Sequence, residues 1–216
     1  MCFAGLPVMA ENLAHLPMFP LGSVVFPFTA IPLRVFEVRY QDLLDSVLDG
    51  DRRFGTVLIE RGFEVGGGDA RFGVGTLVEL VGVQDMDQGH RAIVVAGLER
   101  IRVKGWLEEE SYPVASVDLL AQGHAPAQSD IDRLSASLHR VLALASEMGA
   151  DVLATADLEV SENPLAAAYQ LVALAPLTPL DDQRLLEIDD PVAMVDTACE
   201  LLREQATTLT AQLGSA

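Results

Sequence analysis

Residue types that could form covalent bonds or hold phosphate are sparse in this chain of 216 residues. The single lysine, Lys104, lies in the sequence RIRVKG, whereas a phosphate-binding loop has the form G-x-x-x-x-G-K-[ST]. Gly73 and Gly75 resemble the start of a dinucleotide fingerprint, but the third glycine is missing and a strand pattern follows. We interpret the two glycines as a tight turn. The sequence therefore excludes a P-loop and predicts no bound cofactor.

Metal ligands are also scattered. The four histidines show neither the i, i+4 spacing nor the C-x-x-C partners that bring ligands together on one ion. They are His15, His90, His124 and His139. The acidic pairs, such as Asp189 and Asp190, do not match a calcium-binding loop, and Asp190 is better explained as a helix cap. We predict no metal site.

A hydrolase would need an activated nucleophile. No G-x-S-x-G elbow is present, and a Ser-Lys dyad could use only Lys104, which lies in a charged strand pattern. Removal of Met1 would leave Cys2 as an N-terminal thiol, although we interpret residues 1–14 as a flexible tail. We therefore predict no catalytic residues and no enzyme activity. A stand-alone hydrolase or peptidase with an unrecognised nucleophile stays the alternative.

Composition restricts the partners further. The net charge is −18, from 32 acidic and 14 basic residues, so nucleic acid would be repelled, whereas apolar or basic partners are favoured. The two cysteines, Cys2 and Cys199, have no C-x-x-C partner, which fits a reducing compartment. The N-terminus lacks a basic signal-peptide flank, and apolar runs stop short of the ~18 residues of a membrane span. We expect a cytoplasmic protein without membrane contact.

The elements that must position these residues begin with a segment rich in proline. Pro17, Pro20, Pro27 and Pro32 forbid a helix before Pro32, so residues 15–32 should be extended and incompletely paired, at an edge or around a barrel. Helical spacing follows, and Gly50 should end the helix. The apolar face comprises Phe36, Tyr40, Leu43, Leu44, Val47 and Leu48. We expect Phe36 and Tyr40 to bury this helix on the sheet.

Short β-branched runs come next, separated by turn clusters at residues 66–69 and 85–89. They occupy residues 54–60, 74–83, 91–98, 99–107 and 112–120. The pattern predicts a twisted antiparallel sheet or small barrel, with a bulge or bend at Gly97. The β-rich part thus spans residues 15–122.

Beyond a linker at residues 123–128 the pattern becomes helical. Three helices should start at Asn163-Pro164, Thr178-Pro179 and Asp190-Pro191, because a capping side chain precedes a proline in the first turn. A fourth should start after Ser129 or Asp130. The fold class predicted from these patterns is α+β, a β-rich subdomain followed by a helical bundle at residues 129–216.

The opening segment resembles the Lon protease N-terminal (substrate-binding) domain family. Members begin with L-P-x-F-P-L and reach P-L-x-x-F-E-x-R-Y, which Leu16–Leu21 and Pro32–Tyr40 match. The likeness continues in order through FGTVLIE, GVGTLVEL, VAGLERIRV and YPVASVDLL to AYQLVALAPLTPLDDQRLLEIDDP. It implies a PUA-like pseudobarrel with one helix, joined to a helical bundle. The ATPase and Ser-Lys protease domains of full-length Lon are missing, so we expect a stand-alone member.

The matching motif residues are expected to be structural and to hold the helix to the barrel. They are Pro32, Leu33, Arg34, Phe36, Glu37, Arg39 and Tyr40. Arg34, Glu37 and Arg39 could form a local ion-pair set, which contributes little if exposed. The chain departs from the family at Asp182, where a basic residue is common, and after Pro191, where an arginine often follows. The chain therefore lacks the cations on which such family contacts would depend.

The resemblance implies a non-catalytic, ATP-independent module that binds unfolded or hydrophobic polypeptide through exposed apolar surface, in a groove between the two subdomains. An adaptor for an ATP-dependent protease or chaperone in protein quality control is a variant of this hypothesis, and an independent holdase is another. RNA binding, which PUA-like barrels often show, is a further alternative, although the acidic charge disfavours it. The peptide-contacting residues are not predicted.

Overall fold

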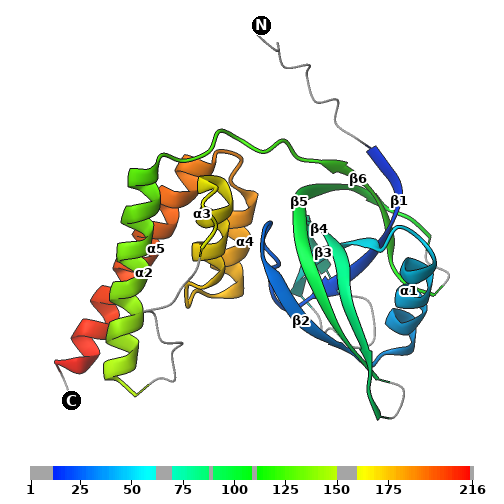
Figure 1. Cartoon of the computed structure of the whole chain (residues 1–216), viewed down its shortest axis with the longest axis horizontal. Coiled ribbons are helices and arrows are strands. Elements are labelled where there is room, and N and C mark those ends of the chain that lie inside the picture. Colours follow the sequence, from blue (N-terminus) through cyan, green and yellow to red (C-terminus); the bar gives the residue numbers. More distant parts are fainter. Residues whose placement is uncertain (1–11, 62–69, 88–89, 109–110, 150–159, 215–216) are drawn as a thin grey trace, which may run out of the picture. The chain divides into compact units, whose positions relative to one another are not determined.

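The computed structural model describes residues 12–61, 70–87, 90–108, 111–149 and 160–214. Cys2 and the glycine-rich turn at residues 66–69 lie outside this part. The chain divides into two compact units (Figure 1). Unit 1 takes up the chain to Val25 and again from Ala30 to Ala121, and unit 2 comprises Phe26–Thr29 and Gln122–Ala216.

Unit 1 is built on one sheet of six strands. The strands are β1 (Asn12–Leu21), β2 (Ala30–Val35), β3 (Arg53–Arg61), β4 (Ala70–Asp85), β5 (Arg91–Trp106) and β6 (Val114–Leu119). The strand order is β2-β5-β4-β3-β1-β6, and an additional pairing of β5 with β6 closes the sheet into a near-barrel. The antiparallel sheet or small barrel expected from the sequence is therefore confirmed.

One pair departs from the antiparallel arrangement. Strands β1 and β3 run parallel, with Met18 opposite Gly55 and Leu21 opposite Leu58. Parallel neighbours need a crossover, because the chain must return to the end where the first strand began. Strand β2 and helix α1 (Val38–Asp49) form that crossover.

The prolines of β1 are accommodated by a change of partner. Residues Asn12–Pro17 pair with β6, and Met18–Leu21 pair with β3. Because proline has no backbone N–H, it fits a strand stretch that is paired along one edge. The incomplete pairing predicted for this segment is confirmed: the Met18 N–H still donates to the Pro113 carbonyl beside β6, but the edge of residues 19–21 opposite β3 has no strand partner within the described part of the chain.

Two glycine predictions have different outcomes. The bulge expected at Gly97 is confirmed, because Val78 pairs with Gly97 while the adjacent Leu77 pairs with Glu99. The tight turn expected at Gly73 and Gly75 is wrong, since both residues lie inside β4. Gly75 is required there by close strand packing: a Cβ atom at this position would lie 2.0 Å from the backbone oxygen of Thr56.

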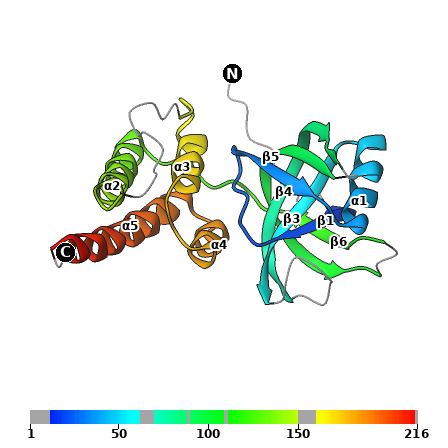
Figure 2. The same cartoon turned by 90° about the horizontal axis from the view of Figure 1, so that it is seen from below.

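Helix α1 covers one side of the sheet (Figures 1 and 2) and shares its core. Its buried residues are Tyr40, Leu43, Leu44 and Val47, at the spacing of one helical face. Gly50 follows the helix as predicted. The Tyr40 ring stacks on Phe19 of β1 with 4.2 Å between centroids. Aromatic burial of this kind is among the larger contributions to a core.

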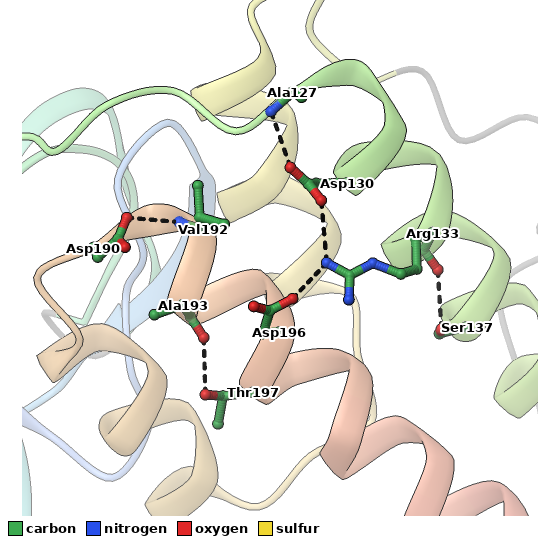
Figure 3. Close-up of polar contacts among 9 residues, drawn as sticks. All are labelled: Ala127, Asp130, Arg133, Ser137, Asp190, Val192, Ala193, Asp196 and Thr197. Carbon is green, nitrogen blue, oxygen red and sulfur yellow. Dashed lines mark hydrogen bonds and ion pairs between the residues drawn. The ribbon is translucent and has the colours of Figure 1, made fainter.

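Four helices lie in the described residues of unit 2, and three of them have the expected start signals. They are α2 (Gln128–Glu147), α3 (Pro164–Ala173), α4 (Pro179–Glu187) and α5 (Pro191–Leu213). The side chains of Asn163, Thr178 and Asp190 accept backbone N–H bonds at the last three starts, and Figure 3 shows the bond from Val192 to Asp190. Helix α2 begins slightly earlier than predicted, because Asp130 accepts the Ala127 N–H from inside the first turn.

Side chains from different helices and from residues 26–29 hold unit 2 together. Arg133 of α2 bonds Asp130 and reaches Asp196 of α5 (Figure 3). The rings of Phe26 and Phe28 lie 6.2 and 6.1 Å from that of Tyr169. The Gln170 side chain donates to the Phe28 carbonyl over 3.0 Å. The expected fold class is confirmed: an α+β chain whose near-barrel sheet carries one helix and is followed by helices that pack together.

The close packing at Gly75 predicts a large stability difference between two neighbouring glycines. Gly75→Ala should lower the free energy of unfolding by about 1–3 kcal/mol, because the added methyl group meets backbone that must shift. Gly73→Ala is the matched control, since a Cβ there meets nothing within 4 Å. Urea unfolding followed by fluorescence of Trp106 measures both. Equal stability of the two variants would contradict the packing at Gly75.

Candidate functional site

A small pocket opens in unit 1 beside the free edge of β2, and we call it the β2 notch. Its cavity volume is ≈ 180 Å³. It is lined by Phe19, Leu21, Ser23, Pro32, Leu33, Arg34, Val35, Phe36, Glu37 and Tyr40. Pockets for drug-sized ligands are larger, about 300–1,000 Å³. The notch therefore has room for one side chain of a larger partner.

Six of the seven motif residues identified in the sequence line this notch, all except Arg39. Arg39 lies beside them, because its Nε donates to the Glu37 carboxylate over 2.9 Å and its guanidinium lies 4.4 Å from the centroid of the Tyr40 ring. The expected ion pair between Glu37 and Arg39 is present, but within the described part of the chain Arg34 does not join it. The structural role expected for the motif stays a prediction.

Phe36 departs from the expectation. Its side chain is 52 % exposed, so the prediction that it buries the helix is wrong, whereas Tyr40 is 2 % exposed and does so. The reason is that the helix starts later than the apolar spacing suggests: Glu37 is the N-cap, in an extended conformation, and Phe36 precedes it. Val38, in the first turn, is 77 % exposed. Phe36 and Val38 therefore expose large apolar side chains to solvent beside the β2 notch.

The Phe36 ring contacts the end of the β4–β5 hairpin. It lies edge-on to the ring of His90, 6.3 Å between centroids, and Met86, whose N–H donates to the His90 carbonyl, is 42 % exposed. We call Phe36, Met86 and His90 the Phe36 patch. Arg91 follows in sequence and bridges the carboxylates of Asp45 and Asp85. The patch is thus apolar, and acidic side chains lie next to it.

Two further pockets of unit 1 are wider. One, ≈ 390 Å³, is lined by His15, Leu107, Glu108, Ser111, Tyr112 and Val114. The other, ≈ 360 Å³, combines apolar residues with His15, Asp51, Arg53 and Glu99. Ser111 and His15 share the first pocket, and no hydrogen bond joins their side chains within the described residues.

Two residues that could take part in nucleophilic catalysis, Lys104 and Cys199, lie in the described part of the chain. The Nζ atom of Lys104 lies 3.1 Å from the carboxylate of Asp118 on the neighbouring strand. Cys199 is buried in α5, and burial raises the pKa of its thiol, which keeps it protonated and weakly nucleophilic. Cys2 lies outside the described residues.

Among the described residues, no group of three or more His, Cys, Asp or Glu side chains could hold a metal ion. No helix in this part of the chain is long and apolar enough to cross a membrane.

Asp182 of α4 is the titratable group most affected by its surroundings. Burial raises its pKa to about 6, and the neighbouring Asp181 carboxylate acts in the same direction. Its Oδ1 atom is buried without a hydrogen-bond donor in the described structure. The Asp182 carboxylate is therefore poorly solvated.

Replacing this carboxylate should therefore stabilise the protein. An ordinary aspartate pKa is about 3.9 and the folded value is raised, so the folded state binds the proton more tightly and stability falls as pH rises from about 4 to about 6. Asp182→Asn should add ~1 kcal/mol to the free energy of unfolding at neutral pH, a value discounted because solvent partly screens the side chain. The gain should vanish near pH ~4.

Urea unfolding followed by far-UV circular dichroism at both pH values measures this effect. The control is Glu200→Gln, which removes an exposed carboxylate of α5. An Asp182→Asn variant no more stable than the wild type at neutral pH would contradict the desolvation of Asp182.

Comparisons with known proteins agree with this architecture. The sequence model of the ATP-dependent protease La (LON) substrate-binding domain matches residues 15–204. A Lon protease of Trichlorobacter lovleyi is 26% identical over 204 residues, 91% of this chain and 25% of the relative. Lon protease 2 of Myxococcus xanthus is 27% identical over 194 residues, 88% of this chain and 24% of the relative. The chain thus spans about a quarter of the length of these curated relatives.

Two solved structures share the fold. A Lon N-terminal domain protein from Xanthomonas campestris is 26% identical and superposes with a TM-score of 0.63, covering 85% of this chain and 96% of that one. The N-terminal domain of Lon protease from the Mycobacterium avium complex is 18% identical, with a TM-score of 0.59 over 89% of this chain and 98% of that one. The second likeness supports the fold alone. Since the family match extends over most of its length, the chain belongs to the Lon substrate-binding domain family.

Proposed function

We propose that this chain binds unfolded or hydrophobic segments of polypeptides and does so without hydrolysing ATP. The family is described as a substrate-binding domain, and the matched relatives are Lon proteases. Their ATPase and protease activities belong to the full-length proteins, of which this chain spans about a quarter. Recognition of polypeptide is the part of that activity which this domain can perform.

The observation that carries the proposal is the exposed Phe36 beside the β2 notch. Phe36 and Met86 expose apolar surface at one place, and the notch next to Phe36 reaches the buried rings of Phe19 and Tyr40. Exposed apolar surface of this kind marks interaction sites, and an unfolded chain offers apolar side chains that a folded protein has buried. The bound segment could then be passed to an ATP-dependent protease or chaperone, which makes this chain an adaptor in protein quality control.

The Phe36→Ser variant tests the proposal. It should weaken binding of reduced, carboxymethylated α-lactalbumin, a permanently unfolded protein, about 5–30-fold, the range expected when one buried apolar contact of roughly 1–2 kcal/mol is lost. Isothermal titration calorimetry measures the affinity. Native α-lactalbumin should not bind.

The matched control is Leu180→Ser, because Leu180 is similarly exposed, at 61 %, but belongs to α4 of unit 2. Its affinity should equal that of the wild type. Equal weakening by both substitutions would show that Phe36 is not the binding site, and an absence of any binding by the wild type would remove the proposed function.

A further inference from the structure

The sheet of unit 1 has one strand that is paired along a single edge. In the described structure β2 pairs with β5 alone, from Ala30 opposite Ala96 to Val35 opposite Arg91, whereas β6 is paired on both sides because it contacts β1 and β5. A strand at an edge presents backbone N–H and C=O groups to an incoming chain. One of these groups is already used, since the Gln41 side-chain amide donates to the Val35 carbonyl over 2.8 Å.

The β2 notch lies along this free edge. Four successive β2 residues, from Pro32 to Val35, line it, and no residue of β5 contributes. Because alternate side chains of a strand point to opposite faces of the sheet, a pocket lined by successive residues lies at the edge of the strand and not on one face. The opposite wall is Phe19 and Leu21 of β1, in the stretch where β1 has lost its β6 partner. The notch is therefore the place where β1 and β2 leave the wall of the barrel unpaired.

The β2 notch is close to neutral at its centre, whereas the surface beyond Phe36 is acidic. Among the lining residues Arg34 and Glu37 carry opposite charges, so the centre is close to neutral. Beyond Phe36, Asp85 and Asp87 of the hairpin end and Asp45 of α1 carry carboxylates, and the Arg91 guanidinium pairs with Asp45 and Asp85. The side chain of Asp85 is 88% exposed and that of Asp45 60%, so both are accessible to a partner.

From these three observations we propose that β2 binds an extended segment of polypeptide as an added strand. The segment hydrogen-bonds to the β2 edge, places one large apolar side chain in the notch on Phe19 and Tyr40, and has a lysine or arginine near the carboxylates beyond Phe36. In strand addition the hydrogen bonds are made to the peptide backbone, so many sequences can bind. The notch adds a preference for the side chain that serves as the anchor. This inference rests on the proposed function, because it specifies how an unfolded polypeptide is held.

Backbone methylation of a peptide tests strand addition directly. The probe is the acetylated and amidated peptide KTVTFTVTK, whose central phenylalanine is the anchor and whose lysines flank it. N-methyl groups on the alternate residues that face β2 should weaken binding at least ~10-fold, since each removes a ladder hydrogen bond, whereas methyl groups on the other alternate set should have little effect. Replacement of the phenylalanine by alanine, or of both lysines by glutamates, should also weaken binding.

Variants of the protein locate the site. Ser23→Trp places a large ring at the wall of the notch and should abolish peptide binding, whereas Ser46→Trp, on the exposed surface of α1, should not. Thermal unfolding of both variants establishes that they are folded. Equal binding by the two variants would overturn the location.

The outcomes separate this inference from the proposed function. If carboxymethylated α-lactalbumin binds but the peptide does not, or if both methylated sets bind like the parent, strand addition on β2 is wrong and the proposed function stands. If the glutamate peptide binds as well as the lysine peptide, the charge preference is wrong. If neither the unfolded protein nor the peptide binds, the proposed function itself fails.

Discussion

Closure of the sheet through β5 and β6 is the constraint on which the rest of unit 1 depends. Strand β5 is long enough to pair with β2 through its first residues and with β6 through its last ones, and the bulge at Gly97 lies between the two regions. Closure at β6 leaves β2 with β5 as its one strand partner among the described residues. It also separates β2 from β1, so that the barrel wall stays unpaired at the β2 notch. The site that we propose for recognition thus lies where the order of the strands leaves the barrel wall unpaired.

The contacts of the motif residues explain the spacing of the motif. Tyr40 and Phe19 form a stacked pair in the core, Arg39 covers the Tyr40 ring and bonds Glu37, and Glu37 precedes the first turn of α1. These contacts fix where the helix begins relative to β2. Phe36, one residue before the cap, is left on the surface as a consequence. The same short segment therefore stabilises the crossover and exposes the apolar side chain that we assign to binding.

The sequence predicts the elements of the fold well and the site only in part. Proline followed by helical spacing, and capping residues before proline, depend on local backbone chemistry, which is why β1, the end of α1 at Gly50 and three helix starts are found where expected. The prediction that Phe36 is buried is wrong, because apolar periodicity does not show on which residue a helix begins. Phe19, Leu21 and Ser23 were missed as notch residues because the opposing wall comes from another strand. Their one signal was the prolines of β1, which indicate incomplete pairing.

Hydrogen exchange of the backbone amides, with and without saturating carboxymethylated α-lactalbumin, tests the central claim most directly. We expect slower exchange in β2 and at Ser23 and Phe36 when the unfolded protein is bound, because strand addition and notch occupancy protect those amides from water. Unchanged exchange in β2, together with protection confined to the helices of unit 2, would contradict it.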